Sequence, residues 1–273
     1  LENKIITKNF RHTCKGKVEL YGQMYHCWKD KGHGRVDLGG AIKQSCDIYF
    51  YEVARLLGID RLQETANSFG LGEKVFENFI EEKEGLMPST LWKKTVLGKP
   101  WFLGETMIAG IGQGYMKFTN VQLCKMMAQF ANGGYKITPS FVQSEKKELN
   151  EKIISNEEHA EFLLQTLYEA TNEPGGTSYS SRINGNMKFA GKTGTAQVRR
   201  ISQSERDQDV KNKDLPWKYR DHSLFVGFGP TNKPKYAITV IIDHGGSGSA
   251  VAAPIARDVM KKIFEKDLKA NNV

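Results

Sequence analysis

Hydrophobic positions in the first two thirds of the chain recur mainly with the period of an α-helix. This spacing predicts helices over residues 38–57, 60–69, 119–131 and 156–168. Asp60 and Thr119 stand where N-caps of the second and third helices are expected. Residues 1–38 and 71–118 show no sustained period, and we expect both segments to be irregular.

The last third of the chain changes to apolar runs of strand length. The candidate strands are residues 187–198, 223–228 and 236–243, with a further short one at 135–141. The connection between the last two is short, which favours antiparallel neighbours. A final helical pattern at 250–264 is expected to cover the sheet. Helices followed by a sheet and a covering helix indicate the α+β class, with a helical part at about 35–170 and a sheet part at about 185–270.

Composition and charge argue against a nucleic-acid-binding protein and against a membrane-spanning segment in this chain. The chain has 273 residues and a formal net charge of +8. Its basic residues are interspersed with acids, so we do not expect nucleic acid as a partner. No apolar run approaches the roughly eighteen residues of a membrane-spanning helix, and the start lacks a signal-peptide pattern. Because the first residue is not Met, we expect a fragment, and an anchor in the natural protein stays open.

Two of the four cysteines raise the question of a metal site. Cys14 and Cys27 lie in a stretch rich in glycine and lysine. Histidines are close by in the sequence at His12, His26 and His33. Three interpretations stay open: unpaired thiols, a disulfide, or two ligands of a structural zinc site. Cys46 and Cys124 lie in apolar helical contexts, and we expect both to be buried thiols.

The stretch KFAGKTGTAQV, residues 188–198, carries the most specific chemistry. On a strand at the rim of a cleft, Lys192 could hold a substrate carboxylate, to which Thr193 and Thr195 could donate hydrogen bonds. Gly194 would let an extended peptide lie against the strand edge. The Thr195 backbone N–H could form half of an oxyanion hole. These features suit acyl transfer on a peptide that ends in a carboxylate.

This KTGT stretch resembles the third signature of the serine transpeptidases and β-lactamases, whose three signatures are S-x-x-K, S-x-N and K-[ST]-G. Ser45-Cys46-Asp47 resembles the second signature as an S-x-D variant. The wider stretches 32–62, 110–123 and 191–198 are similar to class B penicillin-binding proteins of the penicillin-binding protein 2 type. The resemblance runs over nearly the whole chain.

The resemblance implies a peptidoglycan DD-transpeptidase, which cross-links stem peptides ending in D-Ala-D-Ala through a serine acyl-enzyme and is acylated by β-lactams. The implied site residues are catalytic Ser45, Asp47, Lys192 and Thr195, and substrate-binding Thr193, Gly194 and Gln197. Ser45 would pass a proton toward the leaving amine, and Asp47 would orient the catalytic lysine. The resemblance also implies an inner-membrane anchor, a catalytic domain outside the cytoplasm, partners in the cell-elongation machinery and no cofactor for catalysis.

The signature that supplies the nucleophile is missing. No serine precedes Ser45, and the one S-x-x-K sequence, at 144–147, lies in a charged stretch after the second motif. We interpret it as a chance match. We therefore expect a transpeptidase-like domain that lacks its N-terminal strands and nucleophile helix, and a fragment that forms no acyl-enzyme. The alternatives are a non-catalytic β-lactam-binding sensor or scaffold, and a serine β-lactamase, for which no deacylating base is evident.

Overall fold

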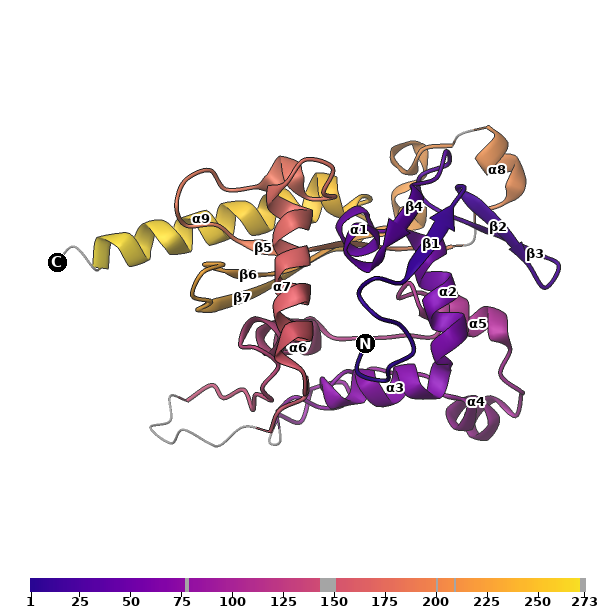
Figure 1. Cartoon of the computed structure of the whole chain (residues 1–273), viewed down its shortest axis with the longest axis horizontal. Helices are drawn as coiled ribbons and strands as arrows, with labels where there is room; N and C mark the ends of the chain where they lie inside the picture. The colour runs from indigo at the N-terminus through magenta and orange to yellow at the C-terminus, as the bar shows by residue number, and fades with distance from the viewer. Residues whose placement is uncertain (77–78, 143–150, 200, 209, 271–273) are drawn as a thin grey trace. The chain divides into compact units, whose positions relative to one another are not determined.

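The computed structural model describes residues 1–76, 79–142, 151–199, 201–208 and 210–270 (Figure 1). Contacts within the chain divide it into two compact units, Leu1–Thr166 and Leu167–Val273. The division falls within helix α7 (Glu157–Asn172). Among the described residues, no helix has both the length and the apolar character that a membrane span needs.

The first unit begins with short strands where the sequence pattern predicted irregular structure. The pairs are antiparallel: β1 (Arg11–Cys14) with β4 (Gly34–Asp37), and β2 (Lys17–Leu20) with β3 (Gln23–His26). The prediction for residues 1–38 was wrong because a four-residue strand is too short to establish a period of two. Each of these strands buries at most one side chain completely.

The helices of the first unit, which precede α7, are α1 (Leu38–Gln44), α2 (Asp47–Leu57), α3 (Ile59–Ser68), α4 (Thr90–Leu97), α5 (Leu103–Ala109) and α6 (Asn120–Ala131). The single helix predicted over 38–57 is two helices, because Ser45 adopts a left-handed conformation (φ 56°, ψ 55°) that ends α1. Thr119 caps α6 as predicted, and its hydroxyl accepts a hydrogen bond from the Gln122 N–H.

Three local predictions in this unit were wrong. Asp60 does not cap α3; its carboxylate instead accepts hydrogen bonds from the N–H and the hydroxyl of Thr90. Helices α4 and α5 occupy a segment predicted to be irregular, and both are too short to show a clear helical period. Residues 135–141 form no strand; Tyr135 makes one isolated bridge with Lys152.

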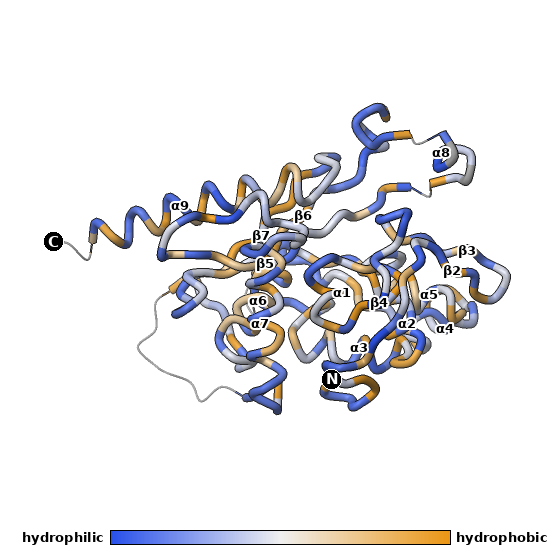
Figure 2. The backbone as a smooth tube through the Cα atoms, turned by 45° about the horizontal axis from the view of Figure 1, so that its top comes forward, coloured by the Kyte–Doolittle hydropathy of each residue, from blue (hydrophilic) through white to orange (hydrophobic). Residues whose placement is uncertain are grey.

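The second unit is built on a three-stranded antiparallel sheet. Its order is β5 (Ala190–Ala196), β6 (His222–Gly229), β7 (Tyr236–Ile242), which confirms the predicted strands and their antiparallel arrangement. After a π-helical turn, Gly248–Ala252, helix α9 (Ala253–Ala270) packs on β6 and β7. Hydrophobic and hydrophilic positions alternate along α9, as expected for a helix with one buried face (Figure 2). The short helix η1 (Tyr179–Ser181) precedes β5. Three more lie between β5 and β6: α8 (Gln203–Asp207), η2 (Asn212–Asp214) and η3 (Trp217–Tyr219).

Close packing explains one of the glycines in β5. Phe189, Phe225 and Met260 are completely buried between the sheet and α9. A Cβ atom on Gly191 would lie 2.3 Å from the Val226 carbonyl oxygen and 2.5 Å from the Phe225 ring. Only glycine therefore lets β5 approach this part of β6.

Candidate active-site motifs and a candidate metal centre

The KTGT stretch lies on β5, which is an edge strand of the three-stranded sheet. The register pairs Lys192 with Val226 of β6. Since successive strand residues face opposite sides, Lys192 and Gly194 share one face, and Thr193 and Thr195 share the other. Within this sheet, the side of β5 away from β6 presents backbone groups to which an extended peptide could pair.

The polar side chains of this stretch are held by neighbours within the second unit. The Lys192 ammonium donates a hydrogen bond to the Thr193 carbonyl oxygen at 3.0 Å. The Thr193 hydroxyl donates to the Thr177 hydroxyl at 3.0 Å. The exposed Thr195 accepts a hydrogen bond on its hydroxyl from the Gly248 N–H at 3.3 Å. The strand therefore positions one cation and two hydroxyl groups within four residues.

The Ser45-Cys46-Asp47 stretch is the junction between α1 and α2 in the first unit. Ser45 is the C-cap of α1, and Cys46 is the N-cap of α2 and is completely buried. Asp47 is the first residue of α2, and its carboxylate accepts a hydrogen bond from the Trp28 N–H at 2.8 Å. The junction thus sets a hydroxyl and a carboxylate two residues apart on a sharply turned backbone.

The two motifs lie in different units, so their arrangement around one groove stays a prediction. Gln197, the remaining residue predicted to bind substrate, is exposed just beyond the end of β5. The S-x-x-K sequence at 144–147 lies outside the described residues.

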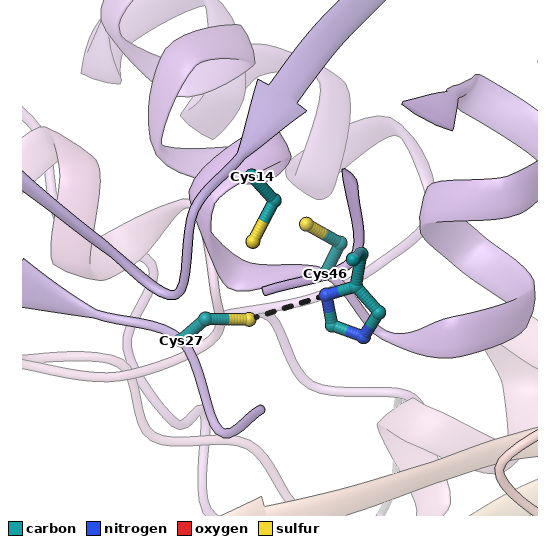
Figure 3. A group of neighbouring side chains, drawn as sticks. Cys14, Cys27 and Cys46 are labelled. Carbon is teal, nitrogen blue, oxygen red and sulfur yellow. Dashed lines mark hydrogen bonds between the residues drawn. The ribbon is translucent and has the colours of Figure 1, made fainter. Parts of the chain in front are cut away.

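Three thiols and an imidazole come together in the first unit. One ligand atom from each of Cys14, Cys27, His33 and Cys46 lies within 4.8 Å of the others. Figure 3 shows the three sulfur atoms turned toward one another, and the dashed line joins the Cys27 sulfur to Nδ1 of His33 at 3.5 Å. All three cysteines are buried and free in the structure. We call these four residues the Cys3His cluster.

The cluster extends the sequence-based expectation. A pair of zinc ligands was one of three interpretations left open for Cys14 and Cys27; the structure shows no disulfide between them and brings His33, of the three nearby histidines, next to them. Cys46 is buried as predicted, but its role as a cluster member was missed because its helical context suggested a core thiol. The spacing C-x12-C-x5-H-x12-C matches none of the short standard zinc motifs, so no local signal in the sequence marked Cys46.

Two glycines allow the chain to fold around the cluster. The Cys27 N–H donates a hydrogen bond to the Gly16 carbonyl oxygen at 2.7 Å. This bond holds the end of the β2–β3 hairpin next to the end of β1. A Cβ atom on Gly16 would lie 1.8 Å from the Asp30 carbonyl oxygen, and one on Gly32 would lie 2.2 Å from that of Cys14. Both glycines also have positive φ angles. The two loops that carry Cys14, Cys27 and His33 can therefore pack directly against each other.

The chemistry of the cluster fits a soft divalent cation. Hydrogen bonding from Cys46 lowers the pKa of the Cys27 thiol, against the effect of burial and with help from the backbone N–H groups of Lys29 and Asp47. The same pairing raises the pKa of the Cys46 thiol. Nδ1 of His33 is the imidazole nitrogen next to the thiols, 3.5 Å from the Cys27 sulfur. In tetrahedral zinc sites with sulfur at about 2.3 Å from the metal, the ligand atoms lie roughly 3.7 Å from one another. The four ligand atoms here lie within 4.8 Å of one another, so small side-chain shifts would bring them to that spacing.

Comparisons with known proteins give one consistent result. Residues 1–261 match the family described as "Penicillin binding protein transpeptidase domain". The chain is 34% identical over 254 residues to a peptidoglycan D,D-transpeptidase MrdA of Salmonella typhimurium, covering 88% of this chain and 40% of that protein. It is 32% identical over 285 aligned positions to MrdA of Escherichia coli K12, covering 98% and 44%. The chain thus spans less than half the length of these curated relatives.

Solved structures agree with the sequence comparison. A complex between PBP2 and MreC from Helicobacter pylori is similar with a TM-score of 0.85 and 31% identity, over 97% of this chain and 46% of that one. Pseudomonas aeruginosa PBP2 in complex with WCK 5153 gives a TM-score of 0.82 and 35% identity, over 95% and 57%. The α+β transpeptidase fold predicted from the sequence is therefore confirmed.

Proposed function

Because the chain belongs to the penicillin-binding protein transpeptidase domain family, we propose that it carries the second and third catalytic signatures of a peptidoglycan D,D-transpeptidase. The observation that supports this most directly is KTGT on an edge strand, where a peptide that ends in a carboxylate can pair with the backbone. The helix junction at Ser45-Cys46-Asp47 is the expected second signature.

The proposed reaction is acyl transfer in two steps. A serine oxygen attacks the carbonyl carbon between two D-alanines; a carbon–oxygen bond forms, the carbon–nitrogen bond breaks, and the departing amine takes up a proton. An amine of a second stem peptide then attacks the ester and releases the serine. Ser45 relays the proton toward the departing amine, and Asp47 orients the lysine that activates the nucleophile. β-Lactams acylate the same serine in this first step.

The edge strand binds the substrate terminus in this proposal. Lys192 supplies the positive charge for the terminal carboxylate, and the hydroxyl groups of Thr193 and Thr195 supply hydrogen bonds. The Thr195 N–H faces the developing oxyanion. Gly194 and the exposed Gln197 flank the extended peptide. The hydrogen bond between Lys192 and the Thr193 carbonyl oxygen keeps the ammonium close to the strand before substrate arrives.

The nucleophile and its lysine lie, in this proposal, in a Ser-x-x-Lys segment of the complete protein that precedes Leu1. A fluorescent penicillin tests this directly. The complete protein is expected to become covalently labelled, and excess unlabelled penicillin is expected to prevent labelling. The 273-residue chain alone is expected to stay unlabelled. Labelling of the chain that disappears in Ser144→Ala would overturn this assignment, and reversible binding by the complete protein would favour a β-lactam sensor.

The cellular setting follows from the family. We propose an inner-membrane anchor outside this chain, a catalytic domain in the periplasm, and stem peptides ending in D-Ala-D-Ala as substrates. Proteins of cell elongation are the proposed partners, since one structural relative is a complex of PBP2 with MreC.

We further propose that the Cys3His cluster holds a structural zinc ion. Three thiols and one imidazole form a closed set of four protein ligands, which is typical of structural sites and leaves no position for a substrate. When bound, the ion would supply a rigid cross-link among β1, the loop after β3 and the start of α2. Metal analysis of the purified protein is expected to give one zinc per chain.

A further inference from the structure

Trp28 contacts both ends of the Ser45-Cys46-Asp47 junction. Its indole Nε1–H donates hydrogen bonds to the Ser45 carbonyl oxygen at 2.8 Å and to that of Gln44 at 3.1 Å. Its backbone N–H donates to Oδ2 of Asp47 at 2.8 Å. One residue therefore holds the carbonyl group of the first signature residue and the carboxylate of the third.

The junction combines a left-handed backbone with helix-end carbonyl groups that need a partner. Ser45 has a positive φ of 56°, which residues other than glycine seldom adopt. The last carbonyl groups of a helix also have no partner within that helix. At the end of α1, the indole N–H supplies such a partner to Gln44 and Ser45 together. The Ser45 backbone is thus held from two sides: the N–H groups of Ser45 and Cys46 donate to carbonyl groups of α1, and the indole N–H binds the carbonyl groups that α1 leaves without a partner.

Hydrophobic burial does not account for a tryptophan at this position. The Trp28 side chain remains 61% exposed, so the ring removes little apolar surface from water. Its ring meets only the edge of the His33 ring among the aromatic residues described, at 5.5 Å between centroids. The polar N–H, rather than the apolar ring, makes the contacts with the junction.

We propose that Trp28 is a positioning residue for acylation: its indole fixes the Ser45 backbone, and its backbone N–H orients the Asp47 carboxylate. This rests on the proposed function, in which Ser45 and Asp47 assist attack by the serine nucleophile. Trp28 acts through these two residues and is not assigned any contact with substrate. Its position next to Cys27 in the sequence also links the junction to the loop that carries the Cys3His cluster.

The decisive comparison uses the complete protein with Trp28→Phe, which removes the indole N–H but keeps an aromatic ring. Trp92→Phe is the matched control, because the Trp92 ring packs on Tyr115 and its indole makes no hydrogen bond among the described residues. Stopped-flow acylation by a fluorescent penicillin separates the dissociation constant of the first complex from the rate constant of acylation. For Trp28→Phe we expect acylation to be roughly 3- to 10-fold slower, equivalent to losing one hydrogen bond.

The dissociation constant, the zinc content and the unfolding midpoint of Trp28→Phe are expected to stay close to those of the Trp92→Phe control. Equal acylation rates in both variants, with the unaltered protein fully active, would overturn the role of Trp28 alone. Failure of the unaltered protein to be acylated would overturn the proposed function, and the role of Trp28 with it. A slower rate explained entirely by a lower unfolding midpoint would show Trp28 to be structural.

The 273-residue chain allows an independent test of the geometry. Trp28 and Trp217 are equally exposed, at 61% and 62%. Of these two side chains, the Trp28 indole is hydrogen-bonded and the Trp217 indole has no hydrogen bond among the described residues. In nuclear magnetic resonance spectra, the Trp28 indole proton is expected to exchange with water at least several-fold more slowly than that of Trp217. Equal exchange rates would contradict the inferred contacts.

Discussion

Zinc binding by the Cys3His cluster should stabilise the first unit in a concentration-dependent way. A ligand that binds only the folded state adds free energy of unfolding equal to RT ln(1 + [L]/Kd), about 2.7 kcal/mol at a hundredfold excess over Kd. Beyond saturation, each further tenfold excess adds about 1.4 kcal/mol. For a unit the size of Leu1–Thr166, one kcal/mol shifts the unfolding midpoint by roughly 2–4 °C. The midpoint should therefore rise by roughly 3–6 °C per decade of free zinc.

Thermal unfolding of the metal-free chain, followed by circular dichroism in zinc buffers, measures this slope. Cys14→Ser removes one of four ligands and should abolish most of the slope, because a hydroxyl is a poor substitute for a thiolate. Cys124→Ser is the matched control. Cys124 is a half-buried cysteine on α6 outside the cluster, and its replacement should leave the slope unchanged.

Three results would refute the zinc assignment. The first is an unfolding midpoint that does not depend on zinc in the unaltered chain. The second is a slope that Cys14→Ser and Cys124→Ser change equally, since that would indicate binding outside the cluster. The third is a zinc content near zero in protein purified without chelators.

Two further predictions concern the second unit. Gly191→Ala should destabilise it by roughly 1–3 kcal/mol, because the new methyl group overlaps β6. Gly194→Ala is the control and should fold normally, since the nearest neighbour of its methyl group would be 3.4 Å away. Equal unfolding midpoints for the two variants would contradict the packing described for β5. Burial raises the pKa of the Asp221 carboxyl above 3.8, so its protonated form stabilises the folded state below that value and the contribution is lost as pH rises through the folded pKa. Asp221→Asn removes this dependence, so the difference in unfolding free energy between the variant and the unaltered chain should shift in favour of the variant as pH rises above 3.8. A difference that stays constant as pH rises would be inconsistent with the assigned direction.

The sequence predicted the elements that bury one continuous face. The strands β5 to β7 and helices α6 and α9 were recognised because their apolar residues repeat over several periods. The break at Ser45 was not recognised, because apolar residues on both sides of it keep a helical spacing. A left-handed residue leaves no mark in the hydrophobic pattern when it is a serine rather than a glycine.

The candidate sites show the same limit. KTGT stood out by its residue types, since a cation, two hydroxyl groups and a glycine are unusual on a core strand, but its interpretation as the third signature rested on the wider resemblance and its role stays a prediction. The Cys3His cluster could be assigned only in part, because Cys46 comes from a different element than Cys14 and Cys27. A ligand set assembled by tertiary packing has no short motif, and the helical spacing around Cys46 describes it as a core residue.

The short strands give the proposed zinc cross-link a structural role. β1 with β4 and β2 with β3 are two-stranded ribbons of four residues each, and such ribbons have little stability on their own. Their ends meet at Cys14 and Cys27, and Cys46 joins them to the start of α2. Because Cys46 is also the middle residue of the Ser45-Cys46-Asp47 junction, the packing that brings the thiols together also fixes the backbone on either side of it. A serine and a carboxylate placed at this junction therefore gain their order from the β ribbons as well as from their own helices.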